Sequence, residues 1–225
     1  MEALACVMFY KNVSRVVFFT CLNLFAQGVI MAKPKNSLTT YRKKRDFTKT
    51  PEPKGGVKTP KSKEHIFVIH KHAATHEHYD FRIEVGGTLK SWAVPKGIST
   101  KPAEKHLAIP TENHPHDYAS FEGVIPEGNY GAGTVMVWDT GTYRNIKTSD
   151  GKLVPMKECI KRGTVEVWLE GKKLHGGYAL IKTKKKDRQF WLILKMKDKF
   201  AGKKIVGANK SAKSGRTMKQ IESAT

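Results

Sequence analysis

The stretch "HYDFRIEV" at residues 78–85 alternates polar and apolar side chains along its whole length. In a β-strand, successive side chains point to opposite faces, so the two kinds of residue separate. The apolar residues form one predicted face: Tyr79, Phe81, Ile83 and Val85. The polar residues form the other: His78, Asp80, Arg82 and Glu84. The apolar face fixes the register, because a shift by one residue would bury all of the polar groups.

Similar short runs of β-branched and aromatic residues occur along the chain, separated by Gly, Pro, Asn or Asp. They are IFVIH (66–70), TLKSWAV (88–94), KHLAIP (105–110), GTVMVWD (133–139), GTVEVWLE (163–170), YALIKT (178–183) and FWLILKM (190–196). This rhythm is typical of an all-β barrel or sandwich, and we expect a mainly all-β, compact β-barrel. One short helix is predicted in PMKECIKR (155–162), because a proline suits the first helical turn.

The segments outside these runs divide the chain into a leader, an N-terminal arm, a barrel domain and a C-terminal tail. Residues 1–30 include VVFFTCLNLFAQGVI (16–30), which is too short to span a bilayer comfortably but long enough for a signal-peptide core. We favour a functional start at Met31, with a cytoplasmic protein and no membrane association, over secretion. Residues 31–64 are predicted to be a basic, extended N-terminal arm without packing. The barrel domain is expected at 65–200, and a basic disordered tail at 201–225.

The 225-residue chain has a formal net charge of +21, which attracts polyanions such as nucleic acid. The basic residues are concentrated in the flanks, while the middle is slightly acidic and holds most of the histidines: His70, His72, His76, His78, His106, His114 and His116. Cys159 is the only cysteine in the body of the chain, so a disulfide framework is excluded there. A reducing cytoplasm fits this cysteine usage.

Three residues near the opening strand have side chains that bind metals. His78 and Asp80 lie on the same predicted face, ~6.6 Å apart along the backbone, and can converge on one cation. His72 can supply a third ligand from an adjacent strand. A mixed nitrogen and oxygen donor set suits Mn²⁺, Zn²⁺ or Fe²⁺ better than Ca²⁺. Arg82 would add a fixed cation that suits an anionic substrate such as phosphate. The alternative, from this stretch alone, is an ordinary solvated sheet face.

A second cluster, "TENHPHDYASFEGVIPEGNYGAG", occupies residues 111–133. His114 and Tyr118 lie there in a predicted loop rich in proline and glycine, where functional groups are often mounted. The part PEGNYGAG (126–133) lacks the Lys-Ser/Thr ending of a phosphate-binding P-loop. It predicts a tight turn that lets strands meet.

Together these stretches resemble the 3′-phosphoesterase domain that stands at the N-terminus of bacterial DNA ligase D and also occurs as a stand-alone protein. The resemblance covers YRKKRDFTKTPEP (41–53), FVIHKHAATHEHYDFRIEVGGTLKSWAVPKG (67–97), ENHPHDYASFEGVIPEGNYGAGTVMVWDTGTY (112–143) and, more loosely, LHGGYALIKT (174–183) and FWLILKMKDKFA (190–201). It implies a DNA-binding β-barrel hydrolase in DNA repair by non-homologous end joining. Such an enzyme removes a 3′-terminal ribonucleoside and then the remaining 3′-phosphate, with Mn²⁺ as the favoured metal.

The resemblance also implies roles for particular residues. The metal ligands fall on His72, His78 and Asp80. The residues that handle phosphate or otherwise support catalysis fall on Arg82, His114, Tyr118, Arg45, Asp46, Glu52 and Glu112. His70 stands where the family more often has glutamine, and His106 where it has an arginine that binds phosphate. A neutral histidine offers less positive charge than arginine, so removal of the dianionic 3′-phosphate is the step that we expect to be weakened.

The partners implied are DNA 3′ ends, in particular a primer-template with a terminal ribonucleotide, in the nucleoid. We expect a separate DNA ligase or polymerase to complete repair. The proton in the reaction could be handled by His114 or by water.

Two other functions fit parts of the sequence. A cupin-like Fe(II) oxygenase would use His78, Asp80 and a distal His114 as its facial triad, although the basic flanks argue against a small-molecule substrate. A non-catalytic basic β-barrel that binds nucleic acid would place aromatics between Lys and Arg on an exposed face. Here the aromatic residues alternate into the apolar face. A protein that only binds nucleic acid would also have no need of the clustered histidines.

Overall fold

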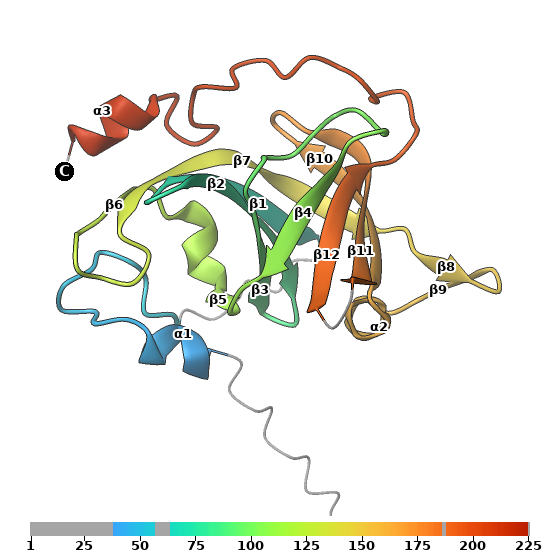
Figure 1. The fold of residues 1–225 in the computed structure, drawn as a ribbon, viewed down its shortest axis with the longest axis horizontal. Helices are drawn as coiled ribbons and strands as arrows, with labels where there is room; N and C mark the ends of the chain where they lie inside the picture. Colours follow the sequence, from blue (N-terminus) through green and yellow to red (C-terminus); the bar gives the residue numbers. More distant parts are fainter. Residues whose placement is uncertain (1–37, 57–63, 186–187, 225) are drawn as a thin grey trace, which may run out of the picture. The chain divides into compact units, whose positions relative to one another are not determined.

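The computed structural model describes residues 38–56, 64–185 and 188–224. Within them, eight antiparallel strands close into a barrel (Figure 1). The order around the barrel is β1 (His65–Ala73), β2 (Glu77–Val85), β3 (Thr88–Val94), β4 (Lys105–Pro110), β12 (Arg188–Lys195), β11 (His175–Lys185), β10 (Thr164–Gly171) and β7 (Gly133–Asn145). β7 pairs back onto β1 and closes the barrel. The predicted all-β barrel is confirmed, and each predicted run forms a strand.

Shorter elements complete the fold. β5 (His114–Pro115) pairs with β3, β6 (Gly123–Ile125) pairs with β7, and β8 (Thr148–Ser149) with β9 (Lys152–Leu153) forms a hairpin. The helices are α1 (Thr39–Lys43), the 3₁₀ helix η1 (His116–Ser120), α2 (Met156–Arg162) and α3 (Met218–Glu222). α2 is the predicted helix, and it ends at Gly163 in the left-handed conformation typical of a helix C-terminus. No helix in the described part of the chain is long and apolar enough to cross a membrane.

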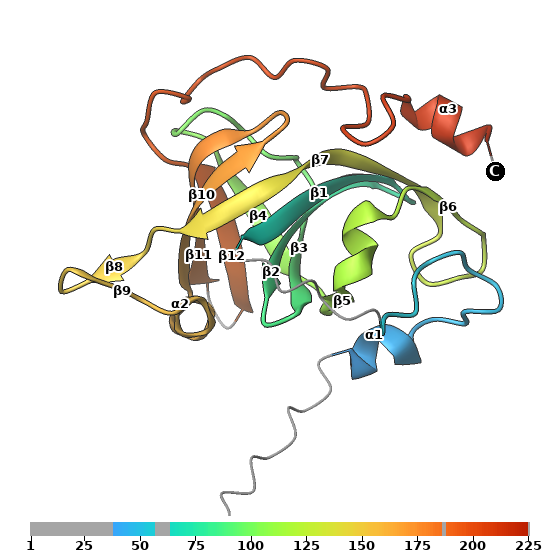
Figure 2. The ribbon, with the colours of Figure 1, turned by 180° about the vertical axis from the view of Figure 1, so that it is seen from behind.

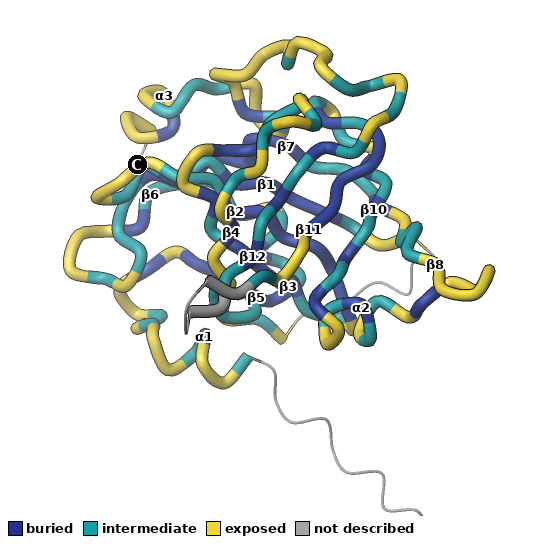
Figure 3. The backbone as a smooth tube through the Cα atoms, turned by 45° about the vertical axis from the view of Figure 1, so that its right-hand side comes forward, coloured by how far each residue is buried: buried dark blue, intermediate teal, exposed yellow. Residues whose placement is uncertain are grey.

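The barrel wall carries two apolar clusters, one on each face. The interior cluster includes Phe81 and Ile83 of β2 and draws on all eight strands, so the register predicted for HYDFRIEV is observed. The outer cluster contains Val68, Leu89 and Val137, covered by residues outside the barrel strands. Buried residues follow the strands, and exposed residues gather in the connections (Figure 3). The outer face of β1, β2 and β3 is therefore packed and not solvated.

Residues 38–56 cover part of that outer face. Tyr41 of α1 is fully buried in the outer cluster, and its hydroxyl donates to the Pro53 carbonyl at 2.7 Å. Both ribbon views place α1 beside β5 (Figures 1 and 2). The prediction of an extended, unpacked arm is wrong here, because single aromatic residues without any helical period anchor the segment. Residues 31–37 and 57–63, and the predicted leader at 1–30, lie outside the described residues.

Residues 201–224 also pack on the barrel, so the predicted disordered tail is wrong for them. Trp138 Nε1 donates to the Ala208 carbonyl at 2.7 Å, and the Ala212 amide donates to the Val137 carbonyl at 2.8 Å. α3 begins with a capping box at Thr217, and Ile221 is buried in the interior cluster. Backbone hydrogen bonds and a helix cap order a segment whose composition is poor in large apolar residues.

Candidate metal and phosphate site

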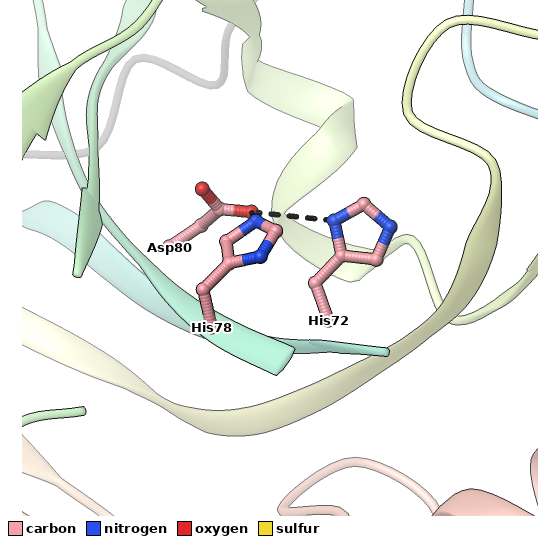
Figure 4. A group of neighbouring side chains, drawn as sticks. All are labelled: His72, His78 and Asp80. Atoms are coloured by element: carbon pink, nitrogen blue, oxygen red, sulfur yellow. Dashed lines mark ion pairs between the residues drawn. The ribbon is translucent and has the colours of Figure 1, made fainter. Parts of the chain in front are cut away.

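The predicted metal ligands meet on the outer face of β1 and β2. His72 pairs directly with His78 across the antiparallel ladder, and Asp80 follows on the same face of β2. Asp80 Oδ2 lies 3.9 Å from His72 Nδ1 and 3.8 Å from His78 Nε2. The three side chains point toward one another, with ligand atoms all within 4.8 Å (Figure 4). The strand pairing thus supplies the third ligand that the sequence left to an adjacent strand.

The protonation of these groups fits a divalent cation. His78 Nδ1 lies 2.9 Å from the His76 carbonyl oxygen, which can only accept, so Nδ1 carries a hydrogen and Nε2 is the nitrogen that faces Asp80 as a possible metal ligand. Burial lowers the pKa of His72, so its ring is neutral at pH 7. His72 Nε2 is buried without a hydrogen-bond partner. Two imidazoles and one carboxylate form a donor set suited to Mn²⁺, Zn²⁺ or Fe²⁺.

Arg82 lies next on the same face and is almost fully buried. Its Nη2 donates to Asp80 Oδ2 at 3.1 Å, its Nη1 donates to Ser91 Oγ at 2.8 Å, and its Nε donates to His70 Nδ1 at 3.3 Å. Nη1 also lies 2.8 Å from His114 Nδ1. Partners on several strands therefore fix the guanidinium plane beside the predicted metal ligands. The alternative of a solvated sheet face is wrong, because the polar side chains here are buried, apart from the half-buried His78.

His114, on β5, lies between two guanidinium groups. Its Nδ1 contacts Arg82, and its Nε2 lies 3.4 Å from Arg45 Nη2. Burial, reinforced by the charges of Arg82 and Arg45, holds the pKa of His114 well below its usual range. The Tyr118 ring packs against it at 4.7 Å between ring centroids. His114 is thus a neutral, tightly held imidazole at pH 7.

The N-terminal segment completes this arrangement with buried ion pairs. Arg45 Nε lies 2.9 Å from Glu52 Oε1, and Arg45 Nη1 lies 3.0 Å from Glu112 Oε1; all three side chains are at most 4% exposed. The Tyr118 hydroxyl donates to Glu52 Oε1 at 3.0 Å. Burial raises the pKa of Tyr118 well above its usual range, so the hydroxyl remains a donor. Lys44 adds a third cation, 3.0 Å from Glu112 Oε2.

One cavity of about 250 Å³ unites most of the predicted site residues: Arg45, His72, His78, Asp80, Arg82, Glu112, His114 and Tyr118. Glu52 lies behind it as the partner of Arg45 and Tyr118. Two predicted residues are not brought to it. The exposed Asp46 accepts a hydrogen bond from Thr48. His106 donates to the Gly97 carbonyl at 2.6 Å.

Several residues of the site escaped the sequence-based predictions. Ser91 holds Arg82, Tyr41 packs on His114, and Thr111 and Tyr130 line the cavity. Ser91 had a usable signal, since it is a polar residue inside the apolar run TLKSWAV. Tyr41 and Tyr130 had none, because their contacts join segments far apart in the sequence.

The geometry does not favour the facial triad of an Fe(II) oxygenase. His72, and not His114, completes the cluster with His78 and Asp80. Both ring nitrogens of His114 face guanidinium groups instead. A cation held by His78 and Asp80 would therefore take its second imidazole ligand from His72 on β1.

Comparisons with known proteins agree with this geometry. Residues 70–182 match the family described as the DNA ligase D 3′-phosphoesterase domain. The chain is 45% identical over 163 residues to the multifunctional non-homologous end joining protein LigD of Pseudomonas aeruginosa, covering 72% of this chain and 19% of that protein. It is 47% identical over 161 residues to the multifunctional non-homologous end joining DNA repair protein LigD of Mycobacterium tuberculosis, covering 72% and 20%. The chain thus spans about a fifth of the length of these relatives. It belongs to the DNA ligase D 3′-phosphoesterase domain family.

Proposed function

We propose that this chain is a metal-dependent 3′-phosphoesterase that processes DNA ends. It removes a 3′-terminal ribonucleoside by hydrolysis of the P–O5′ bond, which leaves a 3′-phosphate, and then removes that phosphate by hydrolysis of the P–O3′ bond. The observation that carries the proposal is the single cavity in which the His72, His78 and Asp80 cluster adjoins Arg82 and His114. Family membership supports the same reaction class.

His72, His78 and Asp80 are the residues that would hold the metal, and Mn²⁺ is the ion that we propose. When bound, a divalent cation acts as a Lewis acid on a phosphate oxygen. The charges around the cavity support its presence. The cationic and carboxylate side chains there balance in number: Lys44, Arg45 and Arg82 against Glu52, Asp80 and Glu112. A divalent cation would therefore give the site the positive charge that a phosphate requires.

Arg82 and His114 are the residues proposed to bind the phosphate group. A guanidinium fixed before substrate arrives stabilises developing charge without reorganisation, which is the main source of such catalysis. The neutral His114 can accept or donate a proton, and water can serve the same need. Tyr118 packs on His114 and, together with Glu52 and Arg45, keeps the imidazole in place.

The chain's net charge of +21 supports DNA as the polyanionic substrate. Because the similar LigD proteins are named for non-homologous end joining, we place the reaction in DNA repair by end joining. A primer-template with a terminal ribonucleotide is the proposed substrate, in the cytoplasm at the nucleoid. A DNA ligase and polymerase are the proposed partners.

The test uses the full chain with Mn²⁺ on two labelled substrates side by side, a DNA with one 3′-terminal ribonucleotide and the same DNA with a 3′-phosphate. We expect the first to shorten to a 3′-phosphate end and both to reach a 3′-hydroxyl. His78→Ala should abolish both steps, whereas His175→Ala, a histidine outside the cavity, should retain them. Wild-type rates for His78→Ala would refute the proposal.

A further inference from the structure

Tyr130 lines the cavity and is 48% exposed as a residue. Every other tyrosine, tryptophan and phenylalanine in the described residues is buried or half-buried. Tyr130 lines the metal and phosphate cavity and also an adjoining hollow of about 380 Å³. The proposed metal and phosphate chemistry leaves this ring without a role.

The turn that carries Tyr130 is hydrogen-bonded and lies close to the proposed metal ligand His72. The Ala132 amide donates to the Asn129 carbonyl at 3.1 Å, and Gly131 adopts a left-handed φ of 78°. A side chain added at Gly131 would lie 3.9 Å from the His72 ring. PEGNYGAG is therefore the tight turn that its sequence predicts, and it places an aromatic ring beside the site.

Cationic groups contact the ring. Lys44 Nζ donates to the Tyr130 hydroxyl at 2.9 Å and lies 4.3 Å from the ring centroid. The Arg45 guanidinium carbon lies 5.5 Å from the same centroid. Because Lys44 and Arg45 are both paired with Glu112, the ring is connected to the phosphate-binding residues. An exposed aromatic face flanked by cations is a typical platform for a nucleobase.

Thr111 provides a second unassigned group in the same two hollows. Its Oγ1 is buried and has no hydrogen-bond partner. Its amide donates to the Ser91 carbonyl at 3.0 Å, and Ser91 is the residue whose hydroxyl accepts from Arg82. A buried polar group without a partner is costly, and Thr111 lines the cavity beside Arg82, so rotation of its side chain would let this hydroxyl gain a partner in a sugar hydroxyl.

We infer that Tyr130 and Thr111 form a nucleoside subsite for the departing 3′-terminal ribonucleoside. The base stacks on the Tyr130 ring, and the ribose 2′-hydroxyl bonds to Thr111 Oγ1. The departing nucleoside fits this subsite better than the upstream strand, because it alone carries a 2′-hydroxyl in a DNA end with one ribonucleotide. This inference rests on the proposed function and adds the recognition of the leaving group to it.

The experiment compares kcat/KM of the full chain with Mn²⁺ on a 3′-terminal ribonucleoside and on the same end with an abasic ribose. The wild type should prefer the base-bearing end by ~10-fold, the scale of stacking on an aromatic residue. Tyr130→Ala should bring that ratio close to one, while Tyr130→Phe and Tyr130→Trp should retain it. Leu153→Ala, another exposed large residue outside the cavity, is the matched control and should keep the wild-type ratio.

Equal losses on both substrates in Tyr130→Ala, or no preference in the wild type, would overturn the stacking role. Thr111→Val should lower the preference for a ribonucleoside over a deoxyribonucleoside end by ~3- to 10-fold, the scale of one hydrogen bond. An unchanged preference would overturn the role of Thr111. If the wild type fails to cleave any of these ends, the proposed function itself fails, so the two failures are distinguishable.

Discussion

Arg82 connects the two halves of the site, because the same guanidinium contacts a proposed metal ligand and the proposed phosphate-binding histidine. Its donors reach Asp80, Ser91 and His70 in different directions from one plane. A lysine would keep the charge but could not make these contacts together. The residue type, and not only its charge, is therefore required.

We expect Arg82→Lys to lower kcat for 3′-end removal by ~100-fold, the usual effect of removing one fixed donor to the transition state. The measurement is steady-state kinetics with Mn²⁺, with urea unfolding to confirm that the variant folds. Arg144→Lys is the matched control, because Arg144 packs over Trp168 outside the cavity. A folded Arg82→Lys with the wild-type kcat would contradict this role.

His114 predicts how stability depends on pH. Its pKa is lowered in the folded state by burial and by two arginines, so folding favours the neutral ring. As pH falls below ~6.5, the unfolded chain binds a proton that the folded chain does not, and stability falls. The stabilisation that comes from a neutral His114 is therefore complete above that pH. Below it, the free energy of unfolding falls by up to ~1.4 kcal/mol for each pH unit.

The check is the free energy of unfolding in urea at pH 7.5 and pH 5.5, in EDTA so that no metal contributes. His114→Gln should lose less stability than the wild type over this interval. Parallel losses in the two proteins would show that His114 is not held neutral.

At the scale of elements, residues 38–56 contribute directly to the site. Tyr41 buries its ring between the barrel and His114, at 5.1 Å between ring centroids. Tyr41→Ala should lower the free energy of unfolding by about 3 kcal/mol, the usual cost of truncating a buried aromatic residue, and should also lower kcat. Tyr41→Phe removes only the hydrogen bond to Pro53 and should cost ~1 kcal/mol. Wild-type stability and kcat in Tyr41→Ala would contradict the packing.

The C-terminal segment holds the loop that carries His114 and Tyr118. Glu122 accepts hydrogen bonds from the Val137 amide and from Ser211, and pairs with Arg216 at 3.2 Å. We expect Glu122→Ala to lower the melting temperature, because it leaves buried donors unpaired. It should also speed proteolysis after residue 200. An unchanged proteolysis rate would indicate that the segment does not depend on this contact.

Local patterns predicted the strands because each run is rich in β-branched and aromatic residues and is bounded by turn residues. The period of two in HYDFRIEV predicted that His78, Asp80 and Arg82 share a face. Local patterns could not predict the cover over that face, since Tyr41, Glu52 and Tyr118 reach it through contacts between segments far apart in the sequence; only the family resemblance pointed to Glu52 and Tyr118. Composition was misleading for residues 201–224, where hydrogen bonds to the barrel create order without many apolar side chains.

At the scale of the whole molecule, the net charge of +21 predicts that the proposed binding to DNA depends on salt. Each phosphate neutralised by Lys or Arg releases counterions, so affinity falls as salt rises. We expect the affinity for a DNA primer end to fall by ~10-fold or more between ~50 and ~200 mM salt. Fluorescence anisotropy measures this, and kcat at saturating DNA should change little. Affinity independent of salt would contradict an electrostatic contribution to binding.

The account as a whole depends on His72, His78 and Asp80 holding a metal that the reaction requires. The most direct test is the rate of ribonucleoside removal from a primer-template as a function of Mn²⁺ concentration, for the wild-type chain and for Asp80→Asn. We predict a rate that rises to saturation with Mn²⁺ and vanishes in EDTA for the wild type, and a near-zero rate at every concentration for Asp80→Asn. A full rate in EDTA, or a wild-type Mn²⁺ dependence in Asp80→Asn, would contradict the account.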